Sequence, residues 1–217
     1  MDAIAAPVLR GRRYGGRPVY FSDVVVRADR PWQRLEDLDG RRWAFNEPYS
    51  HSGFIVALHA LAQRGANAGF VGEPIEAGFH DDAIRQIVDG SADWAAIDSQ
   101  VLDLAARRDP RLRRDLRVID VLGPSTIQPV VASARRLNAS QRANARDALV
   151  AMHADPTDRP TLRSAGIDRF VAIADADYDD IRSMFDVVLA SGLLPDWWWP
   201  RWQALTAVHR PRSAELT

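Results

Sequence analysis

The chain has 217 residues, of which 47% are hydrophobic and 26% charged, and its formal net charge is −1. This is an ordinary globular composition, long enough for one large domain or for two lobes that each have a core. The basic residues are all arginines interspersed with acidic ones, which gives no nucleic-acid footprint, and the absence of cysteine excludes disulfides, thiol catalysis and a thiolate metal site.

The N-terminal third alternates short strands with turns. A buried strand is expected over residues 3–8, and β-branched and aromatic residues predict a second strand over 19–26, after an arginine- and glycine-rich turn. One helical turn over 35–38 ends near Gly40. The start shows no basic segment followed by an apolar one, and no apolar run reaches membrane-spanning length. The sequence as written therefore predicts a soluble chain without an export address.

Three strand, turn and helix units follow one another in the middle of the chain. The strands are predicted at 43–45, 74–79 and 92–97, and the helices run from about 54 to 65, from 80 to 89 and from 99 to 107. A further strand is predicted at 117–122. This repetition is typical of a small α/β domain with a mostly parallel sheet.

Beyond residue 123 the sequence becomes mostly helical. Strands are predicted at 127–133 and 170–173, with helices at 140–153, at 157–165 and from about 177 to Gly192. Ala148, Leu149 and Met152 are expected on the inward face of the first of these helices. Four tryptophans between 197 and 202 stand beside two prolines, outside any clear helix. They indicate a tail folded onto a hydrophobic groove, or alternatively a partner-binding patch.

The segment 46–54, with sequence Asn-Glu-Pro-Tyr-Ser-His-Ser-Gly-Phe, lies at the first strand-to-helix turn. The first backbone N–H groups of a helix lack partners, and the helix dipole places partial positive charge there. Ser50 and Ser52 can add hydroxyl donors, while Gly53 allows close approach to the backbone. The segment therefore predicts an anion-binding loop. Plain helix capping is the alternative interpretation.

Polar residues also follow the other two strands. In a parallel sheet the carboxyl ends of the strands share one edge, where ligands bind. His80 and Asp98 should therefore lie near Ser50, His51 and Ser52. Because Asp98 could accept a hydrogen bond from a protonated anion or from an amine, the site should favour phosphate-, phosphite- or phosphonate-like groups over sulfate. Each residue alone could also be a simple cap or surface group.

Enzymatic interpretations are weaker. Ser50 or Ser52 with His80 and Asp98 could form a serine triad, yet the Gly-x-Ser-x-Gly elbow is missing. Neither a His-Glu-x-x-His motif nor a Walker loop is present, and His59, His153 and His209 have no comparable placement. The sequence thus predicts a protein that is not an enzyme and has neither a cofactor nor a metal site.

Taken together, the motifs resemble the substrate-binding proteins of phosphate, phosphite and phosphonate ABC importers, which are type II periplasmic binding proteins. The Ser50-His51-Ser52-Gly53 loop is the central match. The segments that carry the resemblance are residues 20–29, 35–42, 50–53, 78–81, 96–99, 124–131, 152–156, 169–171 and 177–182. Their order and spacing, rather than any single segment, make the likeness specific.

The resemblance implies an α/β, two-lobed clamshell with mostly parallel sheets that closes on an oxyanion by hinge movement. Residues 1–28 would form the first outer-lobe segment and a hinge strand, 29–123 the inner lobe, and 124–217 the return hinge and the rest of the outer lobe with the C-terminal helices. The chain would cross between lobes at 24–29 and 122–129. The implied ligand contacts are Tyr20, Ser50, His51, Ser52, His80 and Asp98.

The sequence departs from the family pattern at several points. His51 stands where threonine is usual and Tyr49 where glycine is common, and the first strand-helix units of the outer lobe are missing. The resemblance implies an ABC permease as partner and a periplasmic or extracytoplasmic location, whereas the missing signal peptide leaves the cytoplasm open. A cytoplasmic ligand-sensing domain of the same fold is the alternative function, followed by a serine hydrolase.

Overall fold

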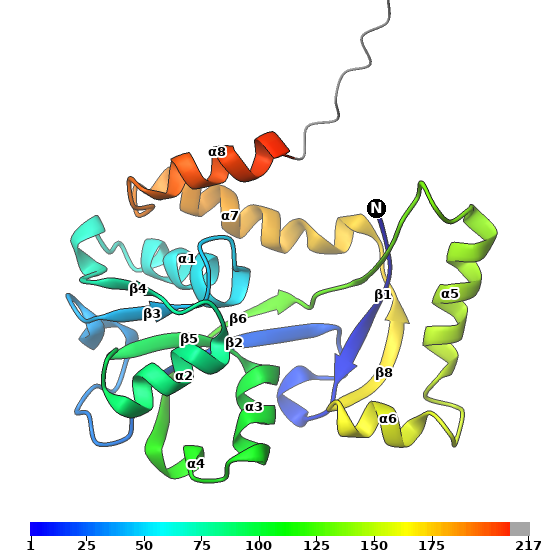
Figure 1. The fold of residues 1–217 in the computed structure, drawn as a ribbon, viewed down its shortest axis with the longest axis horizontal. Helices are drawn as coiled ribbons and strands as arrows, with labels where there is room; N and C mark the ends of the chain where they lie inside the picture. Colours follow the sequence, from blue (N-terminus) through cyan, green and yellow to red (C-terminus); the bar gives the residue numbers. More distant parts are fainter. Residues whose placement is uncertain (209–217) are drawn as a thin grey trace, which may run out of the picture.

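The computed structural model describes residues 1–208, which fold around two β-sheets (Figure 1). The larger sheet has the strand order β4-β3-β5-β2-β6 and the smaller one β7-β1-β8. The strands are β1 (Asp2–Leu9), β2 (Val19–Arg27), β3 (Trp43–Phe45), β4 (Pro74–Glu76), β5 (Trp94–Asp98), β6 (Leu116–Thr126), β7 (Val130–Ala132) and β8 (Ile167–Ala172). The helices are α1 (Val56–Gln63), α2 (His80–Asp89), α3 (Ser99–Arg108), α4 (Leu112–Asp115), α5 (Ala139–Ala151), α6 (Arg159–Ser164), α7 (Asp179–Ser191) and α8 (Trp198–Val208).

The larger sheet is mixed, and the strand pairs of the smaller sheet are antiparallel. In the larger sheet β3 runs parallel to β4 and β5, while β2 lies antiparallel between β5 and β6. In the smaller sheet β1 lies antiparallel between β7 and β8. Helical crossovers give β5 and β6, and likewise β7 and β8, a common direction. An N-terminal strand inserts between the members of each pair, so the prediction of mostly parallel sheets was wrong for the smaller sheet.

The faces of the larger sheet are covered by different helices, as the alternation of its side chains requires. Val24, Trp43 and Trp94 face α1, whereas Val25 and Ala44 face α2. The Trp43 ring stacks on the Trp94 ring, with centroids 5.2 Å apart, and on Phe54 at 5.1 Å. Large apolar burial of this kind is the dominant stabilising term for the sheet that carries the 46–54 loop.

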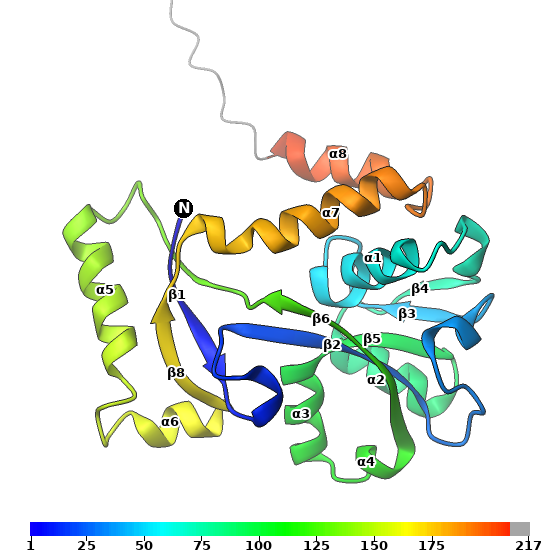
Figure 2. The same ribbon diagram turned by 180° about the vertical axis from the view of Figure 1, so that it is seen from behind.

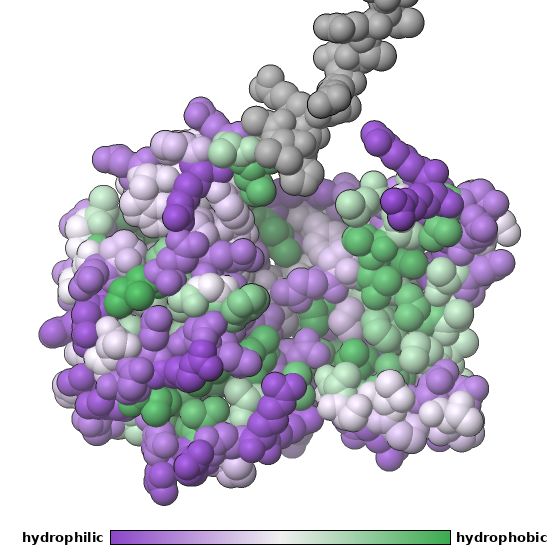
Figure 3. All heavy atoms as spheres, in the orientation of Figure 1, coloured by the Kyte–Doolittle hydropathy of each residue, from purple (hydrophilic) through white to green (hydrophobic). Residues whose placement is uncertain are grey.

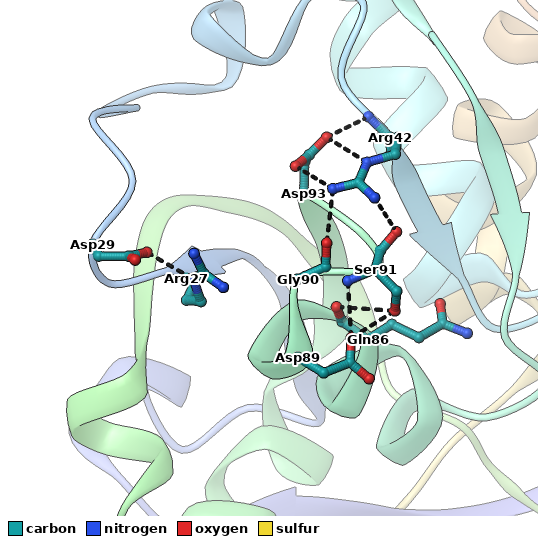
Figure 4. Close-up of polar contacts among 8 residues, drawn as sticks. All are labelled: Arg27, Asp29, Arg42, Gln86, Asp89, Gly90, Ser91 and Asp93. Atoms are coloured by element: carbon teal, nitrogen blue, oxygen red, sulfur yellow. Dashed lines mark hydrogen bonds and ion pairs between the residues drawn. The ribbon is translucent and has the colours of Figure 1, made fainter.

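Arg42, just before β3, holds the loop between α2 and β5 (Figure 4). Its guanidinium donates to both carboxylate oxygens of Asp93 and to the backbone carbonyls of Gly90 and Ser91. An arginine fork suits such multiple acceptors because its donors are planar and fixed. This network lies at the amino ends of β3 and β5. The 46–54 loop, Phe79-His80 and Asp98 lie at the opposite, carboxyl ends of the strands.

The two sheets are joined by the long neighbouring strands β2 and β6 (Figure 2). Val24, Val25 and Val26 are fully buried inside the larger sheet, so the crossing expected at 24–29 does not lie there. The chain instead reaches the larger sheet around Val19, which pairs with Thr126. The crossing is displaced because the β-branched run is stabilised by full burial between β5 and β6.

The smaller sheet has a thin covering. None of the residues of α5 is buried, and of its expected inward residues Ala148 is exposed while Leu149 and Met152 are only half-buried. Apolar side chains gather on the surface over β8 and α5, at the right of Figure 3. This part of the molecule therefore has a much smaller core than the larger sheet.

The C-terminal helices pack on the larger sheet's side rather than with the outer lobe, where they were expected. Helix α7 lies along α1, and Trp198 at the start of α8 is fully buried in the core beneath them. The predicted groove-packed tail is confirmed, but it is a helix. Pro200 is tolerated because it lies in the first helical turn, where its missing N–H is not needed.

Across residues 1–208, no helix has both the length and the apolar character needed to cross a membrane. Residues 209–217, and with them His209, lie outside the described part of the chain.

Candidate functional site

A cleft of about 550 Å³ opens between the carboxyl ends of the larger sheet's strands and the start of α7. Figure 3 shows the molecule hollowed between its two parts. All six residues expected in the site line this cleft. The lining residues are Tyr20, Asn46, Glu47, Ser50, His51, Ser52, His80, Asp98, Gln100, Val101, Thr126, Gln128, Pro129, Tyr178 and Ile181. The predicted convergence of three strand ends is thus present in the fold.

The 46–54 loop ends in a π-helical turn, His51–Ile55, that leads directly into α1. Ser50 is its N-cap, and its Oγ accepts a hydrogen bond of 3.2 Å from the Gly53 N–H. Within residues 1–208 the backbone N–H groups of His51 and Ser52 have no acceptor. Capping and anion binding are therefore compatible here, because the cap leaves two N–H donors unused.

Ser52, which is buried, and His80, which is half-buried, form a pair in the lining of the cleft. The Ser52 Oγ lies 2.8 Å from His80 Nε2 and 3.4 Å from the Ser50 Oγ. Burial lowers the pKa of His80 to about 4, so the ring is neutral near pH 7. Its Nδ1 atom is buried and has no partner in the described chain. A serine triad needs a third group that orients the imidazole, and this pair lacks one.

His51 reaches from the loop to the strand that leads back to the smaller sheet. Its Nε2 atom lies 2.9 Å from the Oγ of Ser125, and the Tyr20 ring meets its ring edge-on at 6.4 Å. Burial lowers the pKa of His51 to about 4 and raises that of Tyr20, so both side chains are neutral. The bulk that His51 introduces into the loop is thereby accommodated against β6.

Asp98 has two functions in the structure. Its Oδ1 caps α3 by accepting from the Gln100 N–H at 2.7 Å, while its Oδ2 accepts from the Gln128 side-chain amide at 3.4 Å. Burial raises the pKa of this carboxyl despite these donors. One carboxylate oxygen therefore faces the cleft beside a weakly bound amide, and can accept a further hydrogen bond.

Gly53 is required for a reason other than the one expected. A Cβ atom at this position would lie 1.9 Å from Asn46 Oδ1 and 3.2 Å from His80 Cε1. The space that was expected to admit a ligand is taken by these two side chains. The Asn46 Oδ1 atom is buried and has no partner in the described chain. Glycine thus lets Asn46 and His80 close over the start of the helix.

Several lining residues were not predicted. Asn46 and Glu47 adjoin the end of β3, so their place after a strand was a usable signal. Thr126 and Gln128 follow a long strand, and only the fold brings them to Asp98. Of the described lining residues, Glu47 and Asp98 are acidic and none is arginine. Residues 1–208 contain no cluster of three histidine or acidic side chains suited to a metal ion.

Two kinds of comparison relate the chain to known proteins. The family model for the periplasmic substrate-binding protein of the phosphonate ABC transporter matches residues 2–178. A binding protein component of an ABC phosphonate transporter from Pseudomonas aeruginosa has a TM-score of 0.76 at 18% identity, with 95% of this chain and 70% of that chain covered.

Two further solved structures are similar. PhnD1 from Prochlorococcus marinus, in complex with methylphosphonate, has a TM-score of 0.69 at 17% identity and covers 83% of this chain and 70% of its own. XAC2383 from Xanthomonas citri, bound to ATP, has a TM-score of 0.62 at 20% identity and covers 87% and 72%. At these identities the likeness shows the fold, and it confirms the predicted α/β periplasmic-binding-protein architecture.

Proposed function

Because this chain belongs to the family of phosphonate ABC-transporter periplasmic substrate-binding proteins, we propose that it binds a small phosphorus oxyanion in the cleft and presents it to an ABC permease. The family consists of binding proteins of transport systems, not of enzymes, and its members are periplasmic. A periplasmic location is accordingly part of the proposal for this chain.

The observation that carries the proposal is the set of uncharged donors at one end of the cleft. The N–H groups of His51 and Ser52 and the hydroxyls of Ser50 and Ser52 all belong to the start of one helical segment. Backbone dipoles in a partly water-excluded cleft stabilise negative charge without a cationic side chain. A phosphonate or phosphate group matches several donors at this spacing.

Asp98 would select for a protonated ligand. A carboxylate oxygen repels a fully ionised anion but accepts a hydrogen bond from a P–OH group or from an ammonium group. None of the described lining residues is an arginine. No cationic side chain there would therefore offset the repulsion between the Asp98 carboxylate and a second negative charge on the ligand. We therefore expect monoprotonated phosphorus oxyanions, or aminophosphonates, to bind better than sulfate.

Closure of the cleft would complete the site. In this proposal the two sheets form the cores of two lobes. The lobe boundaries expected near residues 28 and 123 are shifted, because β2 from Val19 onward and the helices α7 and α8 belong with the larger sheet, and the segments that join the sheets before Val19 and after Thr126 are the hinge. Thr126, Gln128 and Tyr178 would approach the ligand opposite Ser50 and Ser52. A ligand that contacts both sides favours the closed state by the difference of its affinities for the two states.

The test is thermal unfolding of the purified chain with phosphate, phosphite, methylphosphonate, aminoethylphosphonate and sulfate. A ligand present at about 100 times its Kd stabilises the native state by about 2.7 kcal/mol. We expect at least one phosphorus oxyanion to raise the melting temperature and sulfate to leave it unchanged. The effect should vanish in a Ser50→Ala, Asp98→Asn variant and persist in Ser140→Ala, which alters an exposed serine on α5.

Asparagine retains the capping ability at position 98, so a loss of response would report the missing Ser50 hydroxyl and Asp98 carboxylate rather than a damaged start of α3. If no phosphorus oxyanion raises the melting temperature of a well-folded sample, the proposed function is wrong. If sulfate stabilises as strongly as phosphate, the proposed selection by Asp98 is wrong.

A further inference from the structure

The outer side of the 46–54 loop is covered by the first turn of α8. The Trp198 Nε1–H donates a hydrogen bond of 2.8 Å to the backbone carbonyl of Pro48, and both residues are buried. Pro48 lies two residues before Ser50. The contact joins positions that are 150 residues apart in the chain, so it depends entirely on the placement of the C-terminal helices.

Aromatic packing reinforces this contact on the same side of the loop. The Tyr49 ring lies 6.3 Å from Trp198 and 5.9 Å from Trp202, between centroids. Trp202 in turn stacks on Trp198 at 5.1 Å. One turn further along the helix, Arg201 forms an ion pair with Glu76 at the end of β4. Helix α8 thus contacts the chain where both β3 and β4 end.

Residues 50–55 are held by the π-helical turn and by the contacts of His51 with Ser125 and of Ser52 with His80, whereas residues 46–49 have few backbone hydrogen bonds. The Ser50 N–H donates to the Glu47 carbonyl, and the Gly78 N–H donates to the Asn46 carbonyl. For the carbonyl of Pro48, the indole of Trp198 is the partner. A buried carbonyl that loses its partner is costly, so the loop would rearrange to expose it to water. Such a rearrangement would move Ser50, His51 and Ser52.

We propose that Trp198 is a positioning residue for the anion loop: it holds the backbone of Pro48 so that the donors of residues 50–52 face the cleft. The effect on ligand affinity rests on the function proposed above, whereas the effect on the loop does not. The helix pair that presents Trp198 also reaches the cleft, because Asp180 in α7 accepts from the Thr126 N–H at 2.7 Å and Ile181 lines the cleft.

Two variants separate the hydrogen bond from the packing. Trp198→Phe keeps an aromatic ring but removes the donor to Pro48. Trp197→Phe is the matched control, since it removes the same part of a ring from the same cluster and leaves the Pro48 contact intact. Trp197 packs on Phe45 and on Phe54, which follows the residues whose exchange is compared. Amide hydrogen exchange measures the order of the loop without ligand, and calorimetric titration with methylphosphonate measures its consequence for binding.

We expect the amides of residues 49–53 to exchange faster in Trp198→Phe than in Trp197→Phe, with similar exchange in α2 and α3. Methylphosphonate affinity should fall about tenfold, equivalent to about 1.4 kcal/mol, in Trp198→Phe and stay within about twofold of wild type in Trp197→Phe. Equal exchange of the loop in the two variants would overturn the proposal, whether or not the protein binds methylphosphonate.

The indole N–H resonance of Trp198 gives a third readout that needs no stable variant. It should shift when methylphosphonate is added to the wild-type protein, and an unchanged resonance at saturation would count against coupling between α8 and the loop. If wild-type protein binds no phosphorus oxyanion while loop exchange still differs between the variants, the functional proposal fails and the positioning contact stands.

Discussion

The imidazole of His51 lies 2.9 Å from the hydroxyl of Ser125, which joins the loop after β3 to the strand that leads toward the smaller sheet. We expect Ser125→Ala to destabilise the protein by roughly 1–3 kcal/mol, because a buried ring nitrogen would lose its partner. Urea unfolding measures this change. Ser140→Ala, at an exposed position, should stay within about 0.5 kcal/mol of wild type. Equal effects of the two variants would contradict the importance of the contact.

Stability should fall when the pH is lowered from about 7 to about 5. Burial lowers the pKa values of His51 and His80 to about 4 from an ordinary value of 6.5, despite the opposing charges of Asp180 and Asp81. Between these pH values the two histidines bind protons in the unfolded chain but not in the folded chain. The free energy of unfolding therefore falls by on the order of 2 kcal/mol per histidine.

Urea unfolding at both pH values provides the measurement. The raised pKa of Asp98 acts in the opposite direction, since the folded carboxyl binds its proton more readily than the unfolded one. We expect His80→Gln to reduce the pH dependence. An Asp98→Asn protein that is equally stable at both pH values would show that these rings are not held neutral.

Substitution of Gly53 by alanine should destabilise the protein by about 1–3 kcal/mol, because the added methyl group would overlap Asn46 Oδ1. The same substitution in an Asn46→Ala background should cost less, since the overlapping atom is then gone. Urea unfolding of the four proteins gives the coupling energy directly. A cost that is the same in both backgrounds would show that the Asn46 side chain is not the obstacle.

Arg42 should contribute more to the stability of the fold than Arg27, although both form ion pairs with aspartates (Figure 4). Arg27 pairs with Asp29 at the surface, and such pairs contribute little. Arg42 also satisfies the carbonyls of Gly90 and Ser91, which Arg42→Ala would leave without that donor. We expect a clearly lower melting temperature for Arg42→Ala than for Arg27→Ala. Similar melting temperatures for the two variants would show that the Arg42 network contributes no more than a surface ion pair.

Local patterns predicted most elements well. The helix expected at 80–89 is α2 with the same bounds, because Gly90 adopts a positive φ of 82° that ends it. The presence of His80 and Asp98 in one cleft with Ser50, His51 and Ser52 followed from the rule that the carboxyl ends of parallel strands share one edge. That rule held because β3, β4 and β5 are parallel.

The features that the sequence could not predict arise where an N-terminal strand lies between two strands from distant parts of the chain. Nothing in the residues of β1 or β2 tells that each lies between two strands joined by a crossover. The partnership of His51 with Ser125, and that of Asp98 with Gln128, arise from strand β6 and the segment after it. The helix α8 was missed because proline and clustered tryptophans oppose helical periodicity, and burial of Trp198 stabilises the helix instead.

The thin covering of the smaller sheet also has an optical consequence. All seven tryptophans of the chain lie outside that sheet and outside α5 and α6: Trp32, Trp43, Trp94, Trp197, Trp198, Trp199 and Trp202. Indole fluorescence will therefore report on the larger sheet alone, whereas far-ultraviolet circular dichroism also senses α5. The tryptophans are thus an intrinsic spectroscopic probe of one part of the molecule. In any urea range where fluorescence and circular dichroism diverge, the smaller sheet with α5 is unfolded in molecules whose larger sheet is still folded, or the reverse.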